Sequence, residues 1–280
     1  MMLSIIVNHY KSPEVLKLCL NYLKKNAPQG SEIIVTDSET LEKTQDMMRY
    51  DFPEIIFLQE KGNIGFAKSV NRGIGNAQGD FFLIINADVM ITEKNAIPQM
   101  LAYMKKHKDI GILGPRLFNI NGEHQSSCFR FYTPRTIIAR RTPFGKTPWG
   151  KRELDRFLIN HRGLTPMAFG SDPGPLEPAP VDWLMGSTLL VRKAAYEDVG
   201  PMNEEYFMYM EDVDWCRSFW KKEWKVVYYP ETFFYHYHFR ASKGSNPVVD
   251  LFTNKYARIH LLSAIKYFRK YGLKVPKYGI

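Results

Sequence analysis

The sequence predicts an α/β fold in which helices flank a mostly parallel central sheet. Up to Phe118, apolar runs typical of buried strands alternate with segments of helical period. One such run, FFLII at 81–85, carries no polar residue before Asn86, which indicates a strand buried on both faces. The chain of 280 residues is 45% hydrophobic and 24% charged, which suits a globular protein with a large core.

The elements of this half follow one another in regular strand–helix order. A strand at 3–10 leads to a helix that Ser12 caps and Pro13 begins, because these residues favour those positions. The next elements are the strands EIIVTDS and EIIFLQE, the glycine-ended helix GFAKSVNRGIGNAQG, the strand FFLII, a helix over 97–107 and the strand GILGPRLFN. Repeated units of this kind imply a parallel sheet, whose ligands bind at the carboxyl ends of its strands.

The regular alternation ends after Phe118. Residues 131–180 are rich in proline and basic residues, so we expect an irregular insertion there rather than a separate domain. The later elements are the strand VDWLMGSTLLVR, a helix over 193–199, the largely helical stretch MNEEYFMYMEDVDWCRSFWKKE, the strand KVVYYPETFFYHYH and a terminal helix over 251–272.

Composition narrows the class of protein. The formal charge of +9 and the pI near 9.3 indicate an anionic partner, which nucleic acid, a nucleoside diphosphate or anionic lipid would each satisfy. No apolar run reaches the roughly 18–20 residues that span a bilayer, and the N-terminus lacks a basic region and cleavage site of a signal peptide. The three cysteines lie far apart, which indicates reduced thiols. We therefore expect a cytoplasmic protein.

Two strands of the first half end in polar side chains. Asp37 ends the second strand, and Asn86 and Asp88 end the fourth, so all three lie on the ligand edge of the sheet. Each is also typical of a turn or a helix cap. Carboxylate and amide oxygens suit Mg²⁺ or Mn²⁺ bound to a diphosphate, and two acidic strand ends on one edge favour that interpretation.

An acidic cluster and a histidine pair lie in the second half. Glu211 and Asp212 are surrounded by large apolar residues, which raise the pKa of a carboxyl group and suit a general base. Successive helical residues point about 100° apart, so one of the two faces the cleft and the other braces the structure. His236 and His238 alternate on a strand and share a face, as structural residues or as ligands of a metal or phosphate.

The segments that carry a family resemblance are SIIVNHY, IIVTDSE, NIGFAKSVNRGI, GDFFLIINADV, 181–216 and the histidine segment. Together they resemble a family 2 glycosyltransferase of the GT-A fold, in the subgroup of bacterial rhamnosyltransferases. The resemblance implies one domain over 1–245, with a nucleotide-binding half over 1–118, an acceptor half over 119–245 and a helical tail over 246–280. It implies an inverting enzyme that uses a nucleoside diphosphate sugar of dTDP or UDP type, with dTDP-rhamnose suggested by the subgroup. The acceptor is then a hydroxyl of a cell-envelope glycan or a lipid-linked molecule.

The resemblance also assigns the donor site. Asp37 would contact the nucleobase or ribose, and Asn63 and Gly65 would line the nucleotide cleft. Asn86 and Asp88 stand where the family carries its DxD-type motif, so Asp88 would bind a divalent cation, Mg²⁺ or Mn²⁺. The chain departs from the family in its first strand, where Asn8-His9-Tyr10 replaces an Asn-Tyr-Asn type of motif, and after Asp37, where Ser38-Glu39-Thr40 replaces Asn-x-Ser.

The catalytic residues follow from the same resemblance. Asp212 matches the base that deprotonates the acceptor, a task worth roughly 10²–10⁴ in rate. His238, four residues before Ser242, matches the histidine that completes the metal or diphosphate site, and His236 is the less favoured of the two.

The terminal helix allows two interpretations. Lys255, Arg258, Lys266, Arg269 and Lys270 fall within about a third of the helical circumference, with aromatic and aliphatic residues over most of the remainder. Packing on the domain and peripheral contact with an anionic membrane both fit this pattern.

Three other functions compete with glycosyl transfer. A nucleotidyltransferase would need a glycine-rich basic loop after the first strand, and NHYKSPEV does not supply one. Nucleic-acid binding is disfavoured, because no motif for it is present and the acidic clusters point into the expected cleft. A catalytically inactive protein that binds a nucleotide sugar stays open, although it would have no use for a base at Asp212.

Overall fold

A single mixed sheet forms the centre of the molecule. The computed structural model describes residues 2–159, 177–237, 254–276 and 278. Ten of the described strands form one sheet in the order β3-β2-β1-β4-β11-β6-β12-β5, with β7 beside β6 and β9 beside β12. The strands are β1 (Leu3–Tyr10), β2 (Glu32–Ser38), β3 (Ile56–Gln59), β4 (Phe81–Asn86), β5 (Val89–Met90), β6 (Ile110–Phe118), β7 (His124–Gln125), β9 (Ala179–Pro180), β11 (Thr188–Arg192) and β12 (Lys225–His236). A separate pair joins β8 (Cys128–Phe129) to β10 (Trp183–Leu184).

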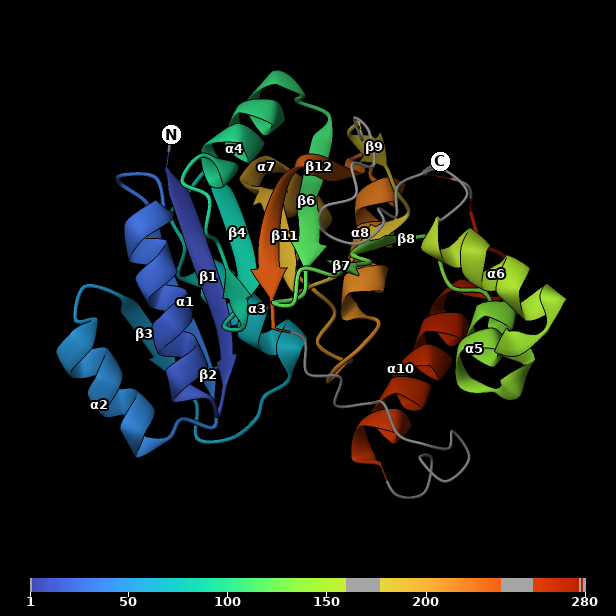
Figure 1. The fold of residues 1–280 in the computed structure, drawn as a ribbon, viewed down its shortest axis with the longest axis horizontal. Coiled ribbons are helices and arrows are strands. Elements are labelled where there is room, and N and C mark those ends of the chain that lie inside the picture. Colours follow the sequence, from blue (N-terminus) through green and yellow to red (C-terminus); the bar gives the residue numbers. More distant parts are fainter. Residues whose placement is uncertain (1, 160–176, 238–253, 277, 279–280) are drawn as a thin grey trace.

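Helices cover both faces of the sheet (Figure 1). The helices are α1 (Pro13–Asn26), α2 (Glu42–Asp51), α3 (Phe66–Gly75), α4 (Ala96–Lys106), α5 (Pro134–Arg141), the 3-10 helix η1 (Pro143–Lys146), α6 (Pro148–Leu158), α7 (Lys193–Val199), α8 (Glu211–Lys221) and α10 (Lys255–Tyr271). Buried residues of α1, α2 and α4 belong to one core cluster, and those of α3, α7, α8 and α10 belong to the other.

The strand β4 shows how the sheet separates these two cores. Phe81, Leu83 and Ile85 belong to the cluster of α1 and α4, whereas Phe82 and Ile84 belong to the cluster of α3 and α8. Side chains of a strand alternate between its faces, so an unbroken apolar run fills both cores. The predicted α/β fold and the two-faced burial of FFLII are confirmed.

The region 181–192, predicted as one strand, divides into β10 and β11. Met185, Gly186 and Ser187 separate the two strands, because the Met185 N–H donates to Ser127 O and the chain changes from one sheet to the other. The strand β11 then inserts between β4 and β6 and runs antiparallel to both. Six strands of the sheet therefore run in one direction, whereas β11 at its centre and the two-residue strands β5, β7 and β9 run antiparallel to their neighbours.

Much of the basic insertion is helical, which the expectation of an irregular segment missed. Both α5 and α6 begin with proline at the first helical turn, directly after Thr133 and Thr147. The Thr133 side chain accepts a hydrogen bond from Thr136 N–H, and the Thr147 side chain accepts one from Gly150 N–H. These prolines start helices rather than interrupt them, since the first turn needs no N–H partner from proline.

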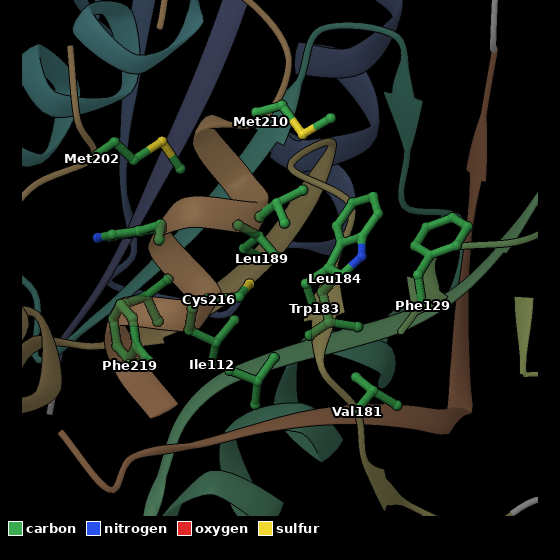
Figure 2. Close-up of a cluster of buried hydrophobic side chains, with 14 of the residues drawn as sticks. Ile112, Phe129, Val181, Trp183, Leu184, Leu189, Met202, Met210, Cys216 and Phe219 are labelled. Atoms are coloured by element: carbon green, nitrogen blue, oxygen red, sulfur yellow. The ribbon is translucent and has the colours of Figure 1, made fainter. Parts of the chain in front are cut away.

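Residues 202–210 do not form the helix that we predicted for the whole acidic segment. Tyr209 and Met210 have φ angles of 68° and 70°, a left-handed conformation that cannot continue a helix, so α8 begins at Glu211. Figure 2 shows Cys216 and Phe219 of α8 packed among buried side chains of neighbouring strands. This packing fixes the helix whose first turn carries Asp212.

The terminal helix α10 packs on the domain through its aromatic side. Tyr267 is fully buried, and Arg217 donates a hydrogen bond to its hydroxyl at 3.0 Å. Lys270 Nζ lies 2.8 Å from Asp214 Oδ2, and Ser263 Oγ donates to Met208 O at 2.9 Å. Within the described residues, the helices are too short or too polar to cross a bilayer.

Candidate active site

The edge predicted to bind the ligand is formed by the carboxyl ends of three adjacent strands. The strand β1 runs parallel to both β2 and β4, and it pairs His9 with Asp37 and Asn8 with Asn86. Because parallel strands end at the same edge, Asp37 and Asn86 flank the end of β1. A hollow of about 530 Å³ between α2 and β3 contains none of the predicted site residues, so we assign the site to this edge on its chemistry.

Asp37 contacts His9, a residue that we did not predict to lie in the site. Both side chains are 1% exposed, and His9 Nδ1 lies 2.7 Å from Asp37 Oδ1. His9 Nε2 accepts a hydrogen bond from Ser12 N–H at 3.0 Å, so in the neutral ring Nδ1 carries the proton and donates it to Asp37. Asp37 Oδ2 is buried and has no hydrogen-bond partner among the described residues.

Asn63 and Gly65 shape the loop that opens α3. Asn63 Oδ1 accepts a hydrogen bond from Gly65 N–H at 3.0 Å, and Phe66 N–H donates to Phe207 O at 3.0 Å. Gly65 has φ 84° and ψ 163°, a conformation almost restricted to glycine, and a Cβ there would lie 2.5 Å from Phe207 O. The loop that precedes α3 is thereby joined to the loop that precedes α8.

We expect Gly65→Ala to destabilise the protein by about 1–3 kcal/mol, because both the backbone conformation and the close approach to Phe207 oppose a side chain. Thermal unfolding would show this as a lower melting temperature. Gly62→Ala is the matched control, since nothing lies within 4 Å of a Cβ at Gly62. Equal melting temperatures for the two variants would contradict this account of the loop.

Asn86 and Asp88 present oxygens that the described residues leave unsatisfied. Neither Asn86 Oδ1 nor Asp88 Oδ1 receives a hydrogen bond within this part of the chain, although both atoms are buried. Buried acceptors without donors are costly unless a ligand satisfies them. An amide and a carboxylate oxygen of this kind fit a hard divalent cation.

His236 is the histidine that the structure brings to Asp88. His236 Nε2 lies 3.2 Å from Asp88 Oδ1, and Nδ1 lies 2.9 Å from Gln125 Oε1. The His236 ring lies between Gln125 and Asp88, and its tautomer decides to which of the two it donates a hydrogen bond.

His238 lies outside the described residues. The last described residue before it, Tyr237, donates its N–H to Asp88 O at 2.8 Å. The described residues contain no cluster of three or more His, Cys, Asp or Glu side chains suited to a metal. A cation at Asp88 would therefore need further oxygens, such as Asn86 Oδ1 and those of a diphosphate.

Asp212 and Glu211 differ in solvent exposure, as the helical geometry predicts. Glu211 is 5% exposed, whereas Asp212 is partly exposed and accepts hydrogen bonds from Gly186 N–H at 3.0 Å and Val213 N–H at 2.9 Å. Burial raises the pKa of Asp212 to about 6, although those two N–H groups act in the opposite direction. Burial and the charge of Asp212 hold the pKa of Glu211 well above its usual range.

The break between β10 and β11 joins the two parts of the site. Gly186 N–H donates to Asp212, and the next residue, Ser187, accepts the N–H of Asn86 through its carbonyl at 3.1 Å. A Cβ on Gly186 would lie 3.1 Å from the Phe66 ring and 3.3 Å from Asp212 Cβ. Two successive residues thus hold the Asp212 carboxylate beside the end of β4.

The sequence interpretation missed His9, Gln125 and the pair Gly186-Ser187. A glycine such as Gly186 within an otherwise apolar strand indicates a break in the strand or the close approach of another segment, and this signal is present in the sequence. His9 and Gln125 carry no comparable signal. Their partners are distant in the chain, at Asp37 and His236.

A model of the family described as "Glycosyl transferase family 2" matches residues 4–159. The N-acetylglucosaminyl-diphospho-decaprenol L-rhamnosyltransferase of Mycobacterium tuberculosis is 29% identical over 232 residues, which cover 78% of this chain and 70% of the relative. The residues that match the family model include Asp37, Asn86 and Asp88.

Two solved structures share the fold. A crystal structure of GalNAc-T7 with UDP, GalNAc and Mn²⁺ has a TM-score of 0.64 at 15% identity, covering 95% of this chain and 48% of that protein. The mannosyltransferase PcManGT from Pyrobaculum calidifontis, in complex with GDP-Man and Mn²⁺, has a TM-score of 0.57 at 13% identity, covering 96% of this chain and 75% of that protein. Both agree with the predicted GT-A architecture, and this chain spans less than half the length of GalNAc-T7.

Proposed function

Because this chain belongs to glycosyl transferase family 2, we propose that it transfers a sugar from a nucleoside diphosphate sugar to an acceptor hydroxyl with inversion. One observation carries the proposal. A partly exposed carboxylate of raised pKa, Asp212, accepts the N–H of Gly186, and the carbonyl of the neighbouring Ser187 accepts the backbone N–H of Asn86 at the end of β4. The base that we propose thus lies beside the edge that we propose for the diphosphate.

In this mechanism Asp212 removes the proton of the acceptor hydroxyl. The hydroxyl oxygen attacks C1 of the sugar on the face opposite the diphosphate, so the bond to the diphosphate breaks and the configuration inverts. Gly186 N–H and Val213 N–H fix the carboxylate in position. A carboxylate with a pKa near the working pH is both sufficiently ionised and sufficiently basic for this task.

We propose that Asn86 and Asp88 hold a divalent cation, Mg²⁺ or Mn²⁺, together with His238. Asn86 Oδ1 and Asp88 Oδ1 are the buried acceptors that support the assignment. A bound cation supplies positive charge to the departing diphosphate. His236, braced by Gln125, would fix the orientation of the Asp88 carboxylate.

The nucleotide end of the donor would lie at the ends of β1 and β2. Asp37 Oδ2 can accept one hydrogen bond from the base or ribose, because His9 occupies Oδ1. Asn63 and Gly65 would form the wall of the nucleotide cleft through the loop that they shape. The donor is of dTDP or UDP type in this proposal. The mycobacterial relative, which is named as an L-rhamnosyltransferase, favours rhamnose as the sugar, and dTDP is the nucleotide that the rhamnosyltransferase subgroup suggests.

The acceptor we propose is lipid-linked or part of a cell-envelope glycan. The name of the mycobacterial relative specifies a diphospho-decaprenol acceptor, and this chain covers 70% of that protein. A soluble nucleotide sugar and a lipid-linked acceptor meet at the inner face of the cell membrane, where we propose that the protein works peripherally.

The pH profile tests the base. Since burial raises the pKa of Asp212 to about 6, the carboxylate is ionised above that pH and protonated below it. We expect kcat to be constant near pH 7.5 and to fall about tenfold for each pH unit well below 6. A flat profile between pH 5 and 7.5 would contradict the assignment, provided that the shift of melting temperature with nucleotide persists at the lower pH.

A panel of nucleotide sugars tests the function itself. Hydrolysis or transfer from at least one dTDP, UDP or GDP sugar, with Mg²⁺ or Mn²⁺ present, is the expected result. Binding of a nucleotide sugar without any turnover would favour the inactive binding protein. Release of pyrophosphate from a nucleoside triphosphate and a sugar phosphate would favour a nucleotidyltransferase.

A further inference from the structure

The positive charge of the protein is concentrated in two helical segments. Residues 134–158 and 255–271 together contain twelve Lys or Arg and two Asp or Glu, which gives +10. The whole chain has a formal charge of +9, so all other residues together contribute −1. We call these two segments, which form α5, η1, α6 and α10, the helical flank.

The two segments are neighbours in space. Arg141 at the end of α5 contacts His260 of α10 through Nη2 and Nδ1. Arg217 of α8 packs on Phe131, just before α5, and donates to Tyr267 of α10. Figure 1 shows α5, α6 and α10 together on the side of the molecule away from α2 and β3.

The helical flank also exposes large apolar side chains. Phe144 of η1 is 60% exposed and Leu262 of α10 is 59% exposed. The exposed apolar residues of the flank are Ile138, Phe144, Trp149, Leu261, Leu262 and Ile265. In α10 they alternate with the exposed residues Arg258 and Arg269, so charge and apolar surface share one face of the helix. The aromatic residue Tyr267, in contrast, faces the domain and is not available to a partner.

The combination of basic charge and exposed apolar side chains distinguishes between the possible anionic partners of the helical flank. A nucleic acid or an acidic polysaccharide would use the charge but would gain little from exposed leucine, phenylalanine and tryptophan side chains. A bilayer surface uses both, since basic residues are attracted to anionic head groups while apolar side chains enter the interface. The charge and the exposed apolar side chains therefore favour an anionic lipid surface as the partner.

We propose that the helical flank is the surface by which the protein binds an anionic lipid bilayer. Leu261, Leu262 and Ile265 of α10 and Phe144 and Trp149 of η1 and α6 would enter the interface, with the surrounding Lys and Arg on the head groups. The inference rests on the proposed function in one respect, because a lipid-linked acceptor explains why such an enzyme needs a membrane surface.

Flotation of the full chain with lipid vesicles tests the proposal. The protein is expected to float with vesicles of phosphatidylcholine and phosphatidylglycerol, and to stay at the bottom with phosphatidylcholine alone. Removing three charges in Lys255→Gln/Arg258→Gln/Arg269→Gln should weaken binding on the order of a hundredfold, at about fivefold for each basic residue. Leu261→Ser/Leu262→Ser/Ile265→Ser should weaken it at least about tenfold.

Matched variants distinguish the flank from the rest of the surface. Lys25→Gln/Lys105→Gln/Lys106→Gln removes three exposed charges from α1 and α4, and Tyr50→Ser removes an exposed aromatic residue from α2. These controls should float like the unchanged protein. Phe144→Ser/Trp149→Ser is a second apolar variant outside α10, in case the triple variant unfolds, and circular dichroism checks the fold of each.

Several outcomes would overturn the proposal. One is that the unchanged protein fails to float, and another is that it floats equally well with vesicles that lack phosphatidylglycerol. A third is that the control variants lose as much vesicle binding as the variants of the helical flank. Tighter binding to a single-stranded oligonucleotide, unaffected by the apolar variants, would show a polyanion site instead. Hydrolysis of a nucleotide sugar, measured without vesicles, is independent of all these results, so failure of the lipid surface and failure of the proposed function can be distinguished.

Discussion

Asp212→Asn is expected to lower the rate of sugar transfer by roughly 10²–10⁴, because the amide cannot take the proton of the acceptor. The replacement retains an oxygen that can accept the N–H of Gly186, so the local structure should persist. The measurement is kcat with a saturating donor, together with the shift of melting temperature that the nucleotide causes. The shift should be unchanged in the variant.

Glu211→Gln is the matched control for this prediction. Glu211 is the neighbouring carboxylate, but it is 5% exposed and cannot reach an acceptor as Asp212 can. We expect a smaller loss of activity than for Asp212→Asn. If Asp212→Asn kept full activity while Glu211→Gln lost it, the roles of the two residues would be the reverse of those proposed.

Asp88→Ala is expected to lower the transfer rate by roughly 10²–10³, the usual cost of removing one group that stabilises developing negative charge. Unlike Asp212→Asn, it should also remove the binding of Mn²⁺. Titration of the protein with Mn²⁺ in the presence of the nucleoside diphosphate measures this directly, without turnover. Unchanged Mn²⁺ affinity in the variant would exclude Asp88 as a ligand.

The two histidines can be separated by the same titration. His236→Gln should weaken Mn²⁺ binding about 10–100-fold, as expected for a residue that orients a ligand. Gln125→Ala should act in the same direction, because the Gln125 side chain contacts His236 Nδ1. His238→Ala should weaken binding more than either. A larger effect at His236 than at His238 would make His236 the ligand.

The predicted strands and the shared edge of Asp37, Asn86 and Asp88 were accessible from sequence because they depend on local period and on a topological rule. Apolar runs that fill two cores can form only a buried strand, and parallel strands must end on one side. The same reasoning failed for 202–210, where polar and aromatic spacing suggested a helix. The left-handed backbone of Tyr209 and Met210 there is a property of the folded chain.

The helices of 134–158 were missed for a different reason. A high proline content suggests irregular structure, but the prolines that begin α5 and α6 each follow a threonine that caps the first turn. A Thr-Pro pair before a run without further proline is a start signal for a helix. The position of these prolines, rather than their number, therefore determines the local structure.

By itself, the sequence determined the class of fold, the edge that carries the acidic strand ends and the carboxylates that we propose for the reaction. The tertiary structure decided which residues contact these carboxylates and histidines. Gly186 and Asp212 are 26 residues apart, and Gln125 and His236 are 111 residues apart, so no periodic pattern connects them. Strand period and helix caps are encoded locally, whereas burial, a raised pKa and an unsatisfied oxygen arise only when distant segments exclude water together.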